Sequence, residues 1–278
     1  PAFGGTGTPR TPAQISSVLE VTVDRLATST EIDGIVLLVP RGMDGFDRFR
    51  QAESDLPVTV HRVDDEVFPG HQSWIREARV SSAASWRGGL HGFTVYDEVL
   101  APSSTLEAMR ELEIDAAVLV GPDWPHVAVG GGYGVDEVVR RYRDRPELPY
   151  VFVQAPPGIG SMLVTRELLE IFGRHPSRRA GFGHLLGYRS EHPESDPVTS
   201  RRCVIPPASV RDATGRYVVD SPHRFERIGP PVDDVEAVIG RCRESSTEVG
   251  TVPPVVRVEL CSGRAVPSPR IPVDLAVE

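Results

Sequence analysis

The sequence predicts an α/β domain with a mostly parallel sheet. Over its first two-thirds, short apolar runs alternate with segments whose apolar residues recur at helical spacing. The runs at 35–39 and 116–120 do not alternate with polar residues, which is typical of strands that helices cover on both faces. In such a doubly wound sheet, ligands bind at the carboxyl ends of the strands.

The first helix is predicted directly after a glycine-rich opening. Thr11 is a typical N-cap, Pro12 suits the first helical position, and apolar residues then recur through Leu26. Ser104 or Thr105 is expected to cap another helix that ends at residue 112. The other elements expected in this part are strands at 35–39, 57–63, 116–120 and 150–153, a helix at 135–143, and a helix that Thr165 caps and that ends at 172.

The C-terminal third is less regular. Residues 174–215 lack periodicity and are expected to form an irregular excursion from the domain. A strand is predicted at 216–220, a helix start at Ser221-Pro222, a helix at 233–243 and a strand at 255–260. We therefore expect one α/β domain over 1–230, and over 231–278 an extension or the start of a second domain.

Charge and composition exclude several classes of protein. The net charge of −9 argues against a nucleic-acid partner, which needs clustered positive charge. No apolar run approaches the roughly 20 residues of a membrane span, and no signal peptide is visible, so we expect a cytoplasmic protein without a membrane partner. Three cysteines are too few for a disulfide scaffold.

All 30 basic residues are arginine, and the chain contains no lysine. This excludes a Schiff-base lysine and the lysine of Walker-type or kinase-type phosphate sites within this chain. Any phosphate chemistry here must depend on arginine, backbone N–H groups and metal ions.

The opening of the chain is a candidate phosphate-binding loop. Gly4, Gly5, Thr6 and Gly7 precede the first helix, and Arg10 follows them. Glycines let backbone N–H groups approach an anion, a helix N-terminus is partly positive, and arginine adds a fork of donors. The alternative is a plain connection between a strand and a helix.

Two aspartates follow predicted strands. Asp123 comes just after the strand at 116–120, and Asp220 ends the strand at 216–220. Two carboxylates at one edge of a sheet could together hold Mg²⁺, which leaves its other positions for phosphate and water. Alternatively, Asp123 is a turn residue between prolines and Asp220 starts a helix.

These motifs resemble those of a known family. PAFGGTGTPR at 1–10 is similar to PARGGSKGIPR, which opens the cytidylyltransferases that activate sialic acid and Kdo (the CMP-sialic acid and CMP-Kdo synthetases). GPDWP at 121–125 resembles their metal-binding QGDEP, and VDSPHRFERI at 219–228 resembles their VDTPEDLERV. SSTLEAM at 103–109 stands where they carry GTDRV near the nucleotide. The resemblance covers about residues 1–230.

The resemblance implies a glycosyltransferase-A-like (GT-A-like) nucleotidyltransferase with a three-layer α/β/α fold. It implies Asp123 and Asp220 as Mg²⁺ ligands, Arg10 and Asp123 as catalytic residues, and Thr105 as a nucleotide-binding residue beside the glycine loop. The expected partners are a nucleoside triphosphate, a small acidic or sugar substrate, and a second copy of the chain in a homodimer.

The chain departs from the family in its first loop. Phe3 stands where the family has arginine, its loop lysine is lost, and only Arg10 remains of its basic residues. Two hypotheses follow. Either other arginines substitute and the enzyme transfers a nucleotide, or the domain is degenerate and binds a ligand or partner without turnover.

A second resemblance concerns the segments 154–158 and 253–260. They are similar to nucleotidyltransferase-like domains that are fused ahead of radical SAM domains. Such a fusion would continue with a CxxxCxxC cluster, whereas Cys261 stands alone here. The degenerate hypothesis therefore includes a binding domain of such a fusion protein.

Overall fold

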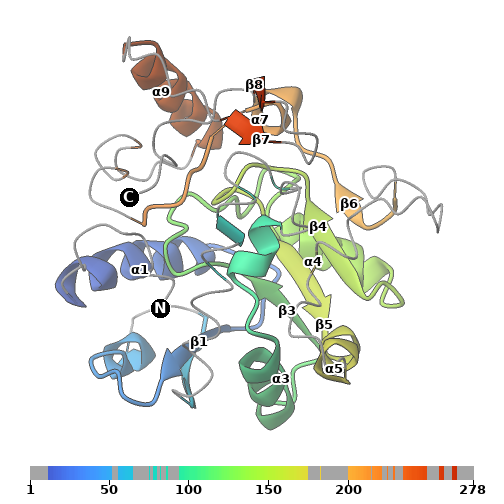
Figure 1. Ribbon diagram of the computed structural model, residues 1–278. Helices are drawn as coiled ribbons and strands as arrows, with labels where there is room; N and C mark the ends of the chain where they lie inside the picture. Colours follow the sequence, from blue (N-terminus) through green and yellow to red (C-terminus); the bar gives the residue numbers. More distant parts are fainter. Residues whose placement is uncertain are drawn as a thin grey trace.

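The computed structural model (Figure 1) has an α/β fold, as the sequence predicts. It describes the backbone of residues 12–51, 56–64, 75, 78, 79, 82, 86, 94–174, 182, 200–213, 215–220, 224, 228, 234–248, 257–259 and 265–267. Thr11 and Ser221-Pro222, for which a helix cap and a helix start are predicted, lie outside these residues.

The N-terminal elements form a small parallel sheet with one covering helix. They are α1 (Pro12–Leu26), β1 (Ile35–Pro40), the 3₁₀ helix η1 (Asp47–Gln51) and β2 (Val58–Val63). β1 and β2 pair in parallel, with Ile35 opposite Val58. Leu19 and Val23 of α1 pack with Ile35 and Phe49 in a buried apolar cluster. Both strands and the helix are where the sequence predicts them.

The central elements build a four-stranded sheet. Its spatial order is β3, β5, β4, β6. The strands are β3 (Ala116–Leu119), β4 (Tyr150–Val153), β5 (Met162–Thr165) and β6 (Cys203–Val204), and the helices of this region are η3 (Val95–Glu98), α3 (Pro102–Glu111), α4 (Val135–Asp144) and α5 (Arg166–Arg174). α3 lies beside α5, and α4 packs on β4 and β5 (Figure 1).

Strand β5, which the sequence does not predict, makes this sheet mixed. It lies between β3 and β4 and is antiparallel to both, whereas β4 and β6 are parallel. Every residue of β4 and β5 is buried. An antiparallel strand buried on both faces has the same uninterrupted apolar sequence as a parallel one, which explains the expectation of a mostly parallel sheet. For the described strands of this sheet, two of three pairings are antiparallel.

Two local predictions are corrected. Residues 216–220 form no strand, because their backbone bonds to loops: Tyr217 N–H donates to Pro157 O at 2.8 Å. α3 begins at Pro102 with Ala101 as N-cap, so neither Ser104 nor Thr105 caps it. Thr165 does accept a hydrogen bond from the Leu168 N–H, at 3.3 Å, at the start of α5.

The C-terminal part adds short elements. α7 (Ala208–Arg211) follows β6, both within the stretch expected to be irregular, and α9 (Val235–Glu248) follows later. β7 (Arg257–Glu259) pairs antiparallel with β8 (Ala265–Pro267). Across the described residues, helices long and apolar enough to cross a membrane are not found.

The main core surrounds an aromatic cluster that fixes η3 against the sheet. The rings of Trp86, Tyr96 and Tyr150 lie 5.1–6.3 Å from that of Phe152 in β4. The Tyr96 hydroxyl donates to the carbonyl of Val153 at the end of β4. Because Glu98 lies two residues beyond Tyr96 in η3, this packing also sets the position of its carboxylate.

Candidate functional site

The two predicted acidic residues, far apart in the sequence, meet on one guanidinium group. Arg79 Nη2 lies 2.7 Å from Asp123 Oδ2, and its Nη1 lies 3.1 Å from Asp220 Oδ2. The structure therefore brings Asp123 and Asp220 together, and it places a cation between them that the sequence does not predict.

Glu98 is the third acid of this cluster. Arg216 donates a fork of hydrogen bonds to both of its carboxylate oxygens, with Nη1 2.7 Å from Oε1. Ser82 Oγ donates to the same Oε1 at 2.9 Å. Arg79 Nε lies 3.3 Å from Glu98 Oε2, an ion pair without a hydrogen bond. Both carboxylate oxygens of Glu98 are thus neutralised.

Arg224 completes the cluster, with its Nε 3.1 Å from Asp220 Oδ1. We call Arg79, Glu98, Asp123, Arg216, Asp220 and Arg224 the ionic cluster. Its three carboxylates and three guanidinium groups balance in charge. The side chains of Glu98 and Asp123 are 1% and 2% exposed, while that of Asp220 is 13% exposed. The cluster therefore lies inside the molecule and approaches solvent at Asp220.

Arg79 stays charged in this position. Burial by itself lowers the pKa of its guanidinium, but the three neighbouring carboxylates outweigh burial, so the pKa is raised above its ordinary value. Deprotonation of Arg79 therefore does not release Asp123 and Asp220 from their ion pairs. Only a movement of the Arg79 side chain could release them.

Backbone contacts explain why Asp123 and Asp220 are neighbours. Asp123 lies in the turn after β3, and its carbonyl accepts the N–H of Val219 at 2.8 Å. A Cβ at Gly121 would lie 2.6 Å from Trp124 Nε1, so this turn needs glycine to pack the indole. The 216–220 segment is thereby held against this turn, with Asp220 at its end.

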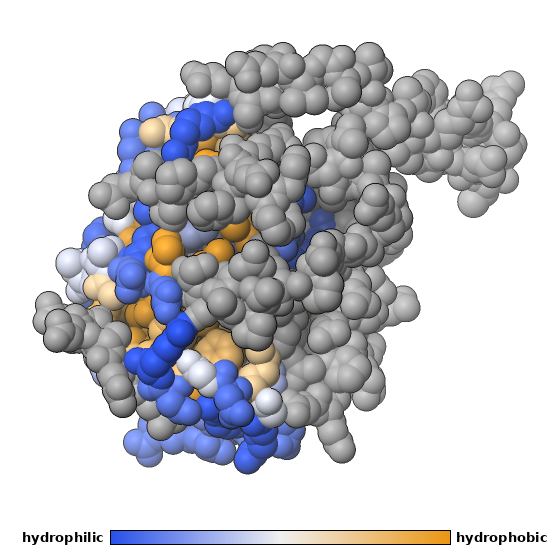
Figure 2. All heavy atoms as spheres, turned by 90° about the vertical axis from the view of Figure 1, so that its left-hand side faces the viewer, coloured by the Kyte–Doolittle hydropathy of each residue, from blue (hydrophilic) through white to orange (hydrophobic). Residues whose placement is uncertain are grey.

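A cavity of about 850 Å³ extends from α3 to the ionic cluster. α1, β1, α3 and β3 supply most of its walls, and Glu98, Gly121 and Pro122 line it next to Asp123. Thr105 lines it as well, and within the described part of the chain its buried Oγ1 has no hydrogen-bond partner. Figure 2 views the side on which α1 and β1 lie and shows apolar side chains among hydrophilic ones there. The cavity suits a ligand with apolar and polar parts.

Of the predicted site residues, the structure thus unites Asp123 and Asp220 and places Thr105 in the adjoining cavity. Gly4, Gly5, Thr6, Gly7 and Arg10 lie outside the described residues. The sequence pattern gives no signal for Arg79 or Glu98.

The donor atoms of Asp123 and Asp220 fit Mg²⁺, which prefers hard oxygen ligands. Asp123 Oδ1 is buried and has no hydrogen-bond partner among the described residues, and a metal ion would supply one. A second group that could hold a metal ion is formed by His61, Glu107 and Glu111, whose ligand atoms lie within 4.8 Å of one another. Of its two glutamates, Glu111 is exposed and Glu107 is half-buried.

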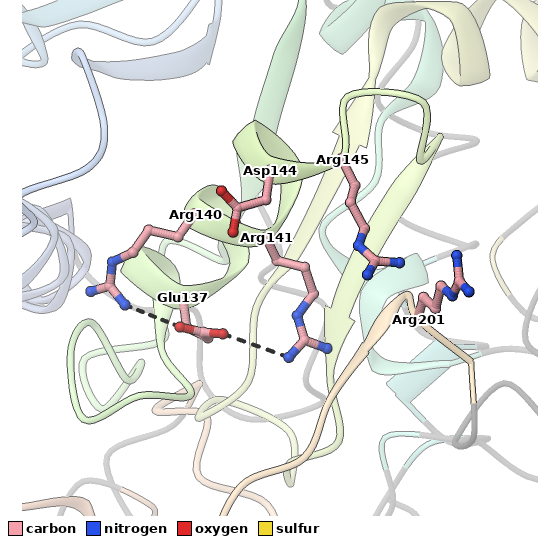
Figure 3. A pocket seen from close by; sticks show the side chains of 6 residues that line it. All are labelled: Glu137, Arg140, Arg141, Asp144, Arg145 and Arg201. Atoms are coloured by element: carbon pink, nitrogen blue, oxygen red, sulfur yellow. Dashed lines mark hydrogen bonds and ion pairs between the residues drawn. The ribbon is translucent and has the colours of Figure 1, made fainter.

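A second hollow, of about 410 Å³, lies on α4 (Figure 3). Glu137 pairs there with Arg140 at 3.0 Å and with Arg141 at 3.6 Å, while Arg145 and Arg201 extend toward the same space (Figure 3). None of the residues predicted to bind nucleotide or metal is among the described residues that line this hollow.

In comparisons with known proteins, neither a family model nor a curated protein sequence matches the chain. A solved structure does: a cytidylyltransferase from Leptospira borgpetersenii serovar Hardjo-bovis (strain JB197), with 15% sequence identity and a TM-score of 0.54. The match covers 90% of this chain and 94% of that chain. At this identity the similarity concerns the fold. The chain thus has a cytidylyltransferase-like α/β fold, as its motifs suggest.

Proposed function

We propose that the chain is a Mg²⁺-dependent nucleotidyltransferase of the cytidylyltransferase type, with a GT-A-like three-layer fold. It would bind a nucleoside triphosphate in the cavity that adjoins the ionic cluster. The observation that carries this proposal is the meeting of Asp123 and Asp220 on a single cation. The similarity of the fold to a cytidylyltransferase supports it.

In this proposal, an oxygen of a small acidic or sugar substrate attacks the α-phosphorus of the triphosphate. The new P–O bond replaces the bond to pyrophosphate, which leaves, and the proton of an attacking hydroxyl passes to solvent or a base. Mg²⁺ held by Asp123 and Asp220 would neutralise charge on the phosphates.

The other site residues would bind and orient the nucleotide. The glycine loop and Arg10 would hold the triphosphate. The buried, unpartnered hydroxyl of Thr105 would find its hydrogen bond in the nucleotide. Asp123 Oδ1, also unpartnered, is the oxygen that is free to accept the metal.

A second candidate function is ligand binding without turnover, as in a degenerate domain beside a radical SAM enzyme. The charge balance of the ionic cluster favours it, because Arg79 already neutralises the carboxylates that would hold the metal. Pyrophosphate release separates the two functions: the enzyme releases it from CTP when given an acceptor, whereas the binding domain does not.

The first prediction concerns the metal ligands. Asp123→Asn and Asp220→Asn should each lower the Mg²⁺-dependent affinity for CTP by about tenfold or more, because one charged oxygen ligand is lost. Calorimetric titrations of CTP with Mg²⁺ and with EDTA measure this, and thermal unfolding verifies that each variant is folded.

The matched control is Asp212→Asn, at an exposed carboxylate that pairs with Arg211. It should bind CTP as the parent chain does. Mg²⁺-dependent binding of parental strength in both site variants would refute the assignment of the metal ligands.

A further inference from the structure

Arg79 occupies the position between Asp123 and Asp220 that the proposed function gives to a metal ion. Its two terminal nitrogens contact one oxygen of each aspartate, at 2.7 and 3.1 Å. A divalent cation that used both carboxylates would need the same space. The guanidinium and the metal therefore exclude each other.

The energetics of the cluster keep the guanidinium there in the free protein. Its side chain is only 10% exposed and faces three carboxylates, so its departure would leave buried negative charge without compensation. A free divalent cation must also lose water to enter, which Mg²⁺ does reluctantly. The cation alone is thus a poor competitor for this position.

A polyphosphate changes this balance. Its oxygens accept forked hydrogen bonds from a guanidinium as carboxylates do, so an arginine can exchange one anion for the other without losing its pairing. The cavity reaches the cluster at Glu98, whose Oε2 lies 3.3 Å from Arg79 Nε, and Gly121 and Pro122 line it next to Asp123. A ligand that filled this end of the cavity would therefore approach the residues that hold Arg79.

We propose, building on the proposed function, that Arg79 is an exchangeable internal cation. In the free protein it holds Asp123 and Asp220 and keeps divalent cations out. When a nucleoside triphosphate binds, the guanidinium moves to the phosphates and the two carboxylates become available to the metal. Metal binding at this site therefore depends on the nucleotide.

Titration with Mn²⁺ alone, without nucleotide, tests the exclusion. All proteins carry Glu107→Gln, which removes a ligand from the His61 group and thereby its contribution to the signal. The parent should show no binding at the cluster. Arg79→Gln should gain a Mn²⁺ site at the cluster. Its affinity for Mn²⁺ should exceed that of the parent at the same position by on the order of 100-fold, because one positive charge no longer lies between the two carboxylates.

Three further variants make the result specific. Adding Asp123→Asn to Arg79→Gln should abolish the new site, and Arg79→Lys, which keeps the charge, should behave as the parent. Arg110→Gln, at an exposed arginine that pairs with Glu170, should also leave Mn²⁺ binding unchanged. Circular dichroism melting shows which variants are folded.

A second titration adds CTP. The parent should then bind Mn²⁺ together with CTP, and Arg79→Gln should bind CTP more weakly than the parent. Mn²⁺ binding to the nucleotide-free parent with the affinity of Arg79→Gln would overturn the proposal, as would a folded Arg79→Gln that gains no site. If CTP binds to none of the proteins while Arg79→Gln still gains the Mn²⁺ site, the proposed function fails and the exclusion by Arg79 stands.

Discussion

His126 is a buried imidazole whose two ring nitrogens find no hydrogen-bond partner in the part of the chain that the structure describes. Burial lowers its pKa to about 4, and the positive charges of Arg25 and Arg241 contribute to the same shift. In the unfolded chain, the pKa of a histidine is about 6.5. The folded protein therefore holds His126 neutral in a pH range where the unfolded chain takes up a proton.

The sign of the resulting pH dependence follows from linkage. The contribution of His126 to stability is fully present above pH 6.5 and is lost as the pH falls toward 4, because the unfolded state binds the proton first. Between pH 7 and pH 4.5, the parent should lose about 2.5 kcal/mol more unfolding free energy than His126→Leu, which cannot titrate.

Urea denaturation of both proteins at the two pH values measures this difference. The carboxylates that titrate in the same range are common to both proteins and cancel in the comparison. Equal losses in the parent and in His126→Leu would show that His126 does not carry a depressed pKa.

At the scale of elements, the loop before α4 depends on one glycine. A Cβ at Gly134 would lie 2.2 Å from the carbonyl oxygen of Val129, where the loop turns back on itself and the N–H of Val135 donates to Ala128 O at 3.0 Å. Gly134→Ala should lower the unfolding free energy by about 3 kcal/mol, because the backbone must shift to admit the methyl group.

Gly130→Ala in the same loop is the control, since a Cβ there has no atom within 4 Å. It should change the free energy of unfolding by less than about 0.5 kcal/mol. Urea denaturation at pH 7 measures both variants. A Gly134→Ala variant as stable as Gly130→Ala would mean that the loop relaxes without cost.

The sequence predicts those elements that local pattern determines. α1, β1, β2 and α4 have clear apolar periodicity or uninterrupted apolar runs, and all four form where expected. The sequence does not predict β5, because its four residues run directly into α5 with no turn residue to separate them.

The predicted strand at 216–220 shows the opposite case. Its residues have the apolar, β-branched character of a strand, but their backbone partners are loop residues such as Pro157. The apolar, β-branched character of this segment is readable from the sequence, whereas its hydrogen-bond partners are set by the tertiary structure.

The candidate site is predictable only in part for the same reason. Asp123 and Asp220 follow apolar runs, so their positions at segment ends are visible in the sequence. Arg79 and Glu98 contact them only through tertiary folding, and no local spacing marks these two residues among the other charged residues of the chain.

At the scale of the whole molecule, the ionic cluster links segments that are distant in the chain. It joins Arg79, η3, the turn after β3 and the 216–220 segment. Glu98 and Asp220 each contact at least two arginines of this cluster, and Asp123 contacts Arg79, so one replacement disturbs several segments at once. Replacements of such coupled charges do not change the free energy of unfolding additively.

The final prediction concerns the buried pair of Arg216 and Glu98. Their side chains are 4% and 1% exposed, so removal of the guanidinium leaves a buried carboxylate that Arg79 and Ser82 only partly compensate. Arg216→Met should therefore lower the free energy of unfolding by about 3–5 kcal/mol. Arg110→Met, which removes a 58% exposed arginine paired with Glu170, should cost less than about 1 kcal/mol.

Urea denaturation at pH 7 compares the two single variants with the double variant Arg216→Met, Glu98→Gln. Because the double variant removes the buried charge together with its partner, it should recover part of the stability that Arg216→Met loses. Equal stability of Arg216→Met and Arg110→Met would show that the cluster is open to water, since only hydration could then stabilise the remaining carboxylate. In that case Asp123 and Asp220 would also be hydrated, and the departure of Arg79 would no longer leave buried negative charge without compensation.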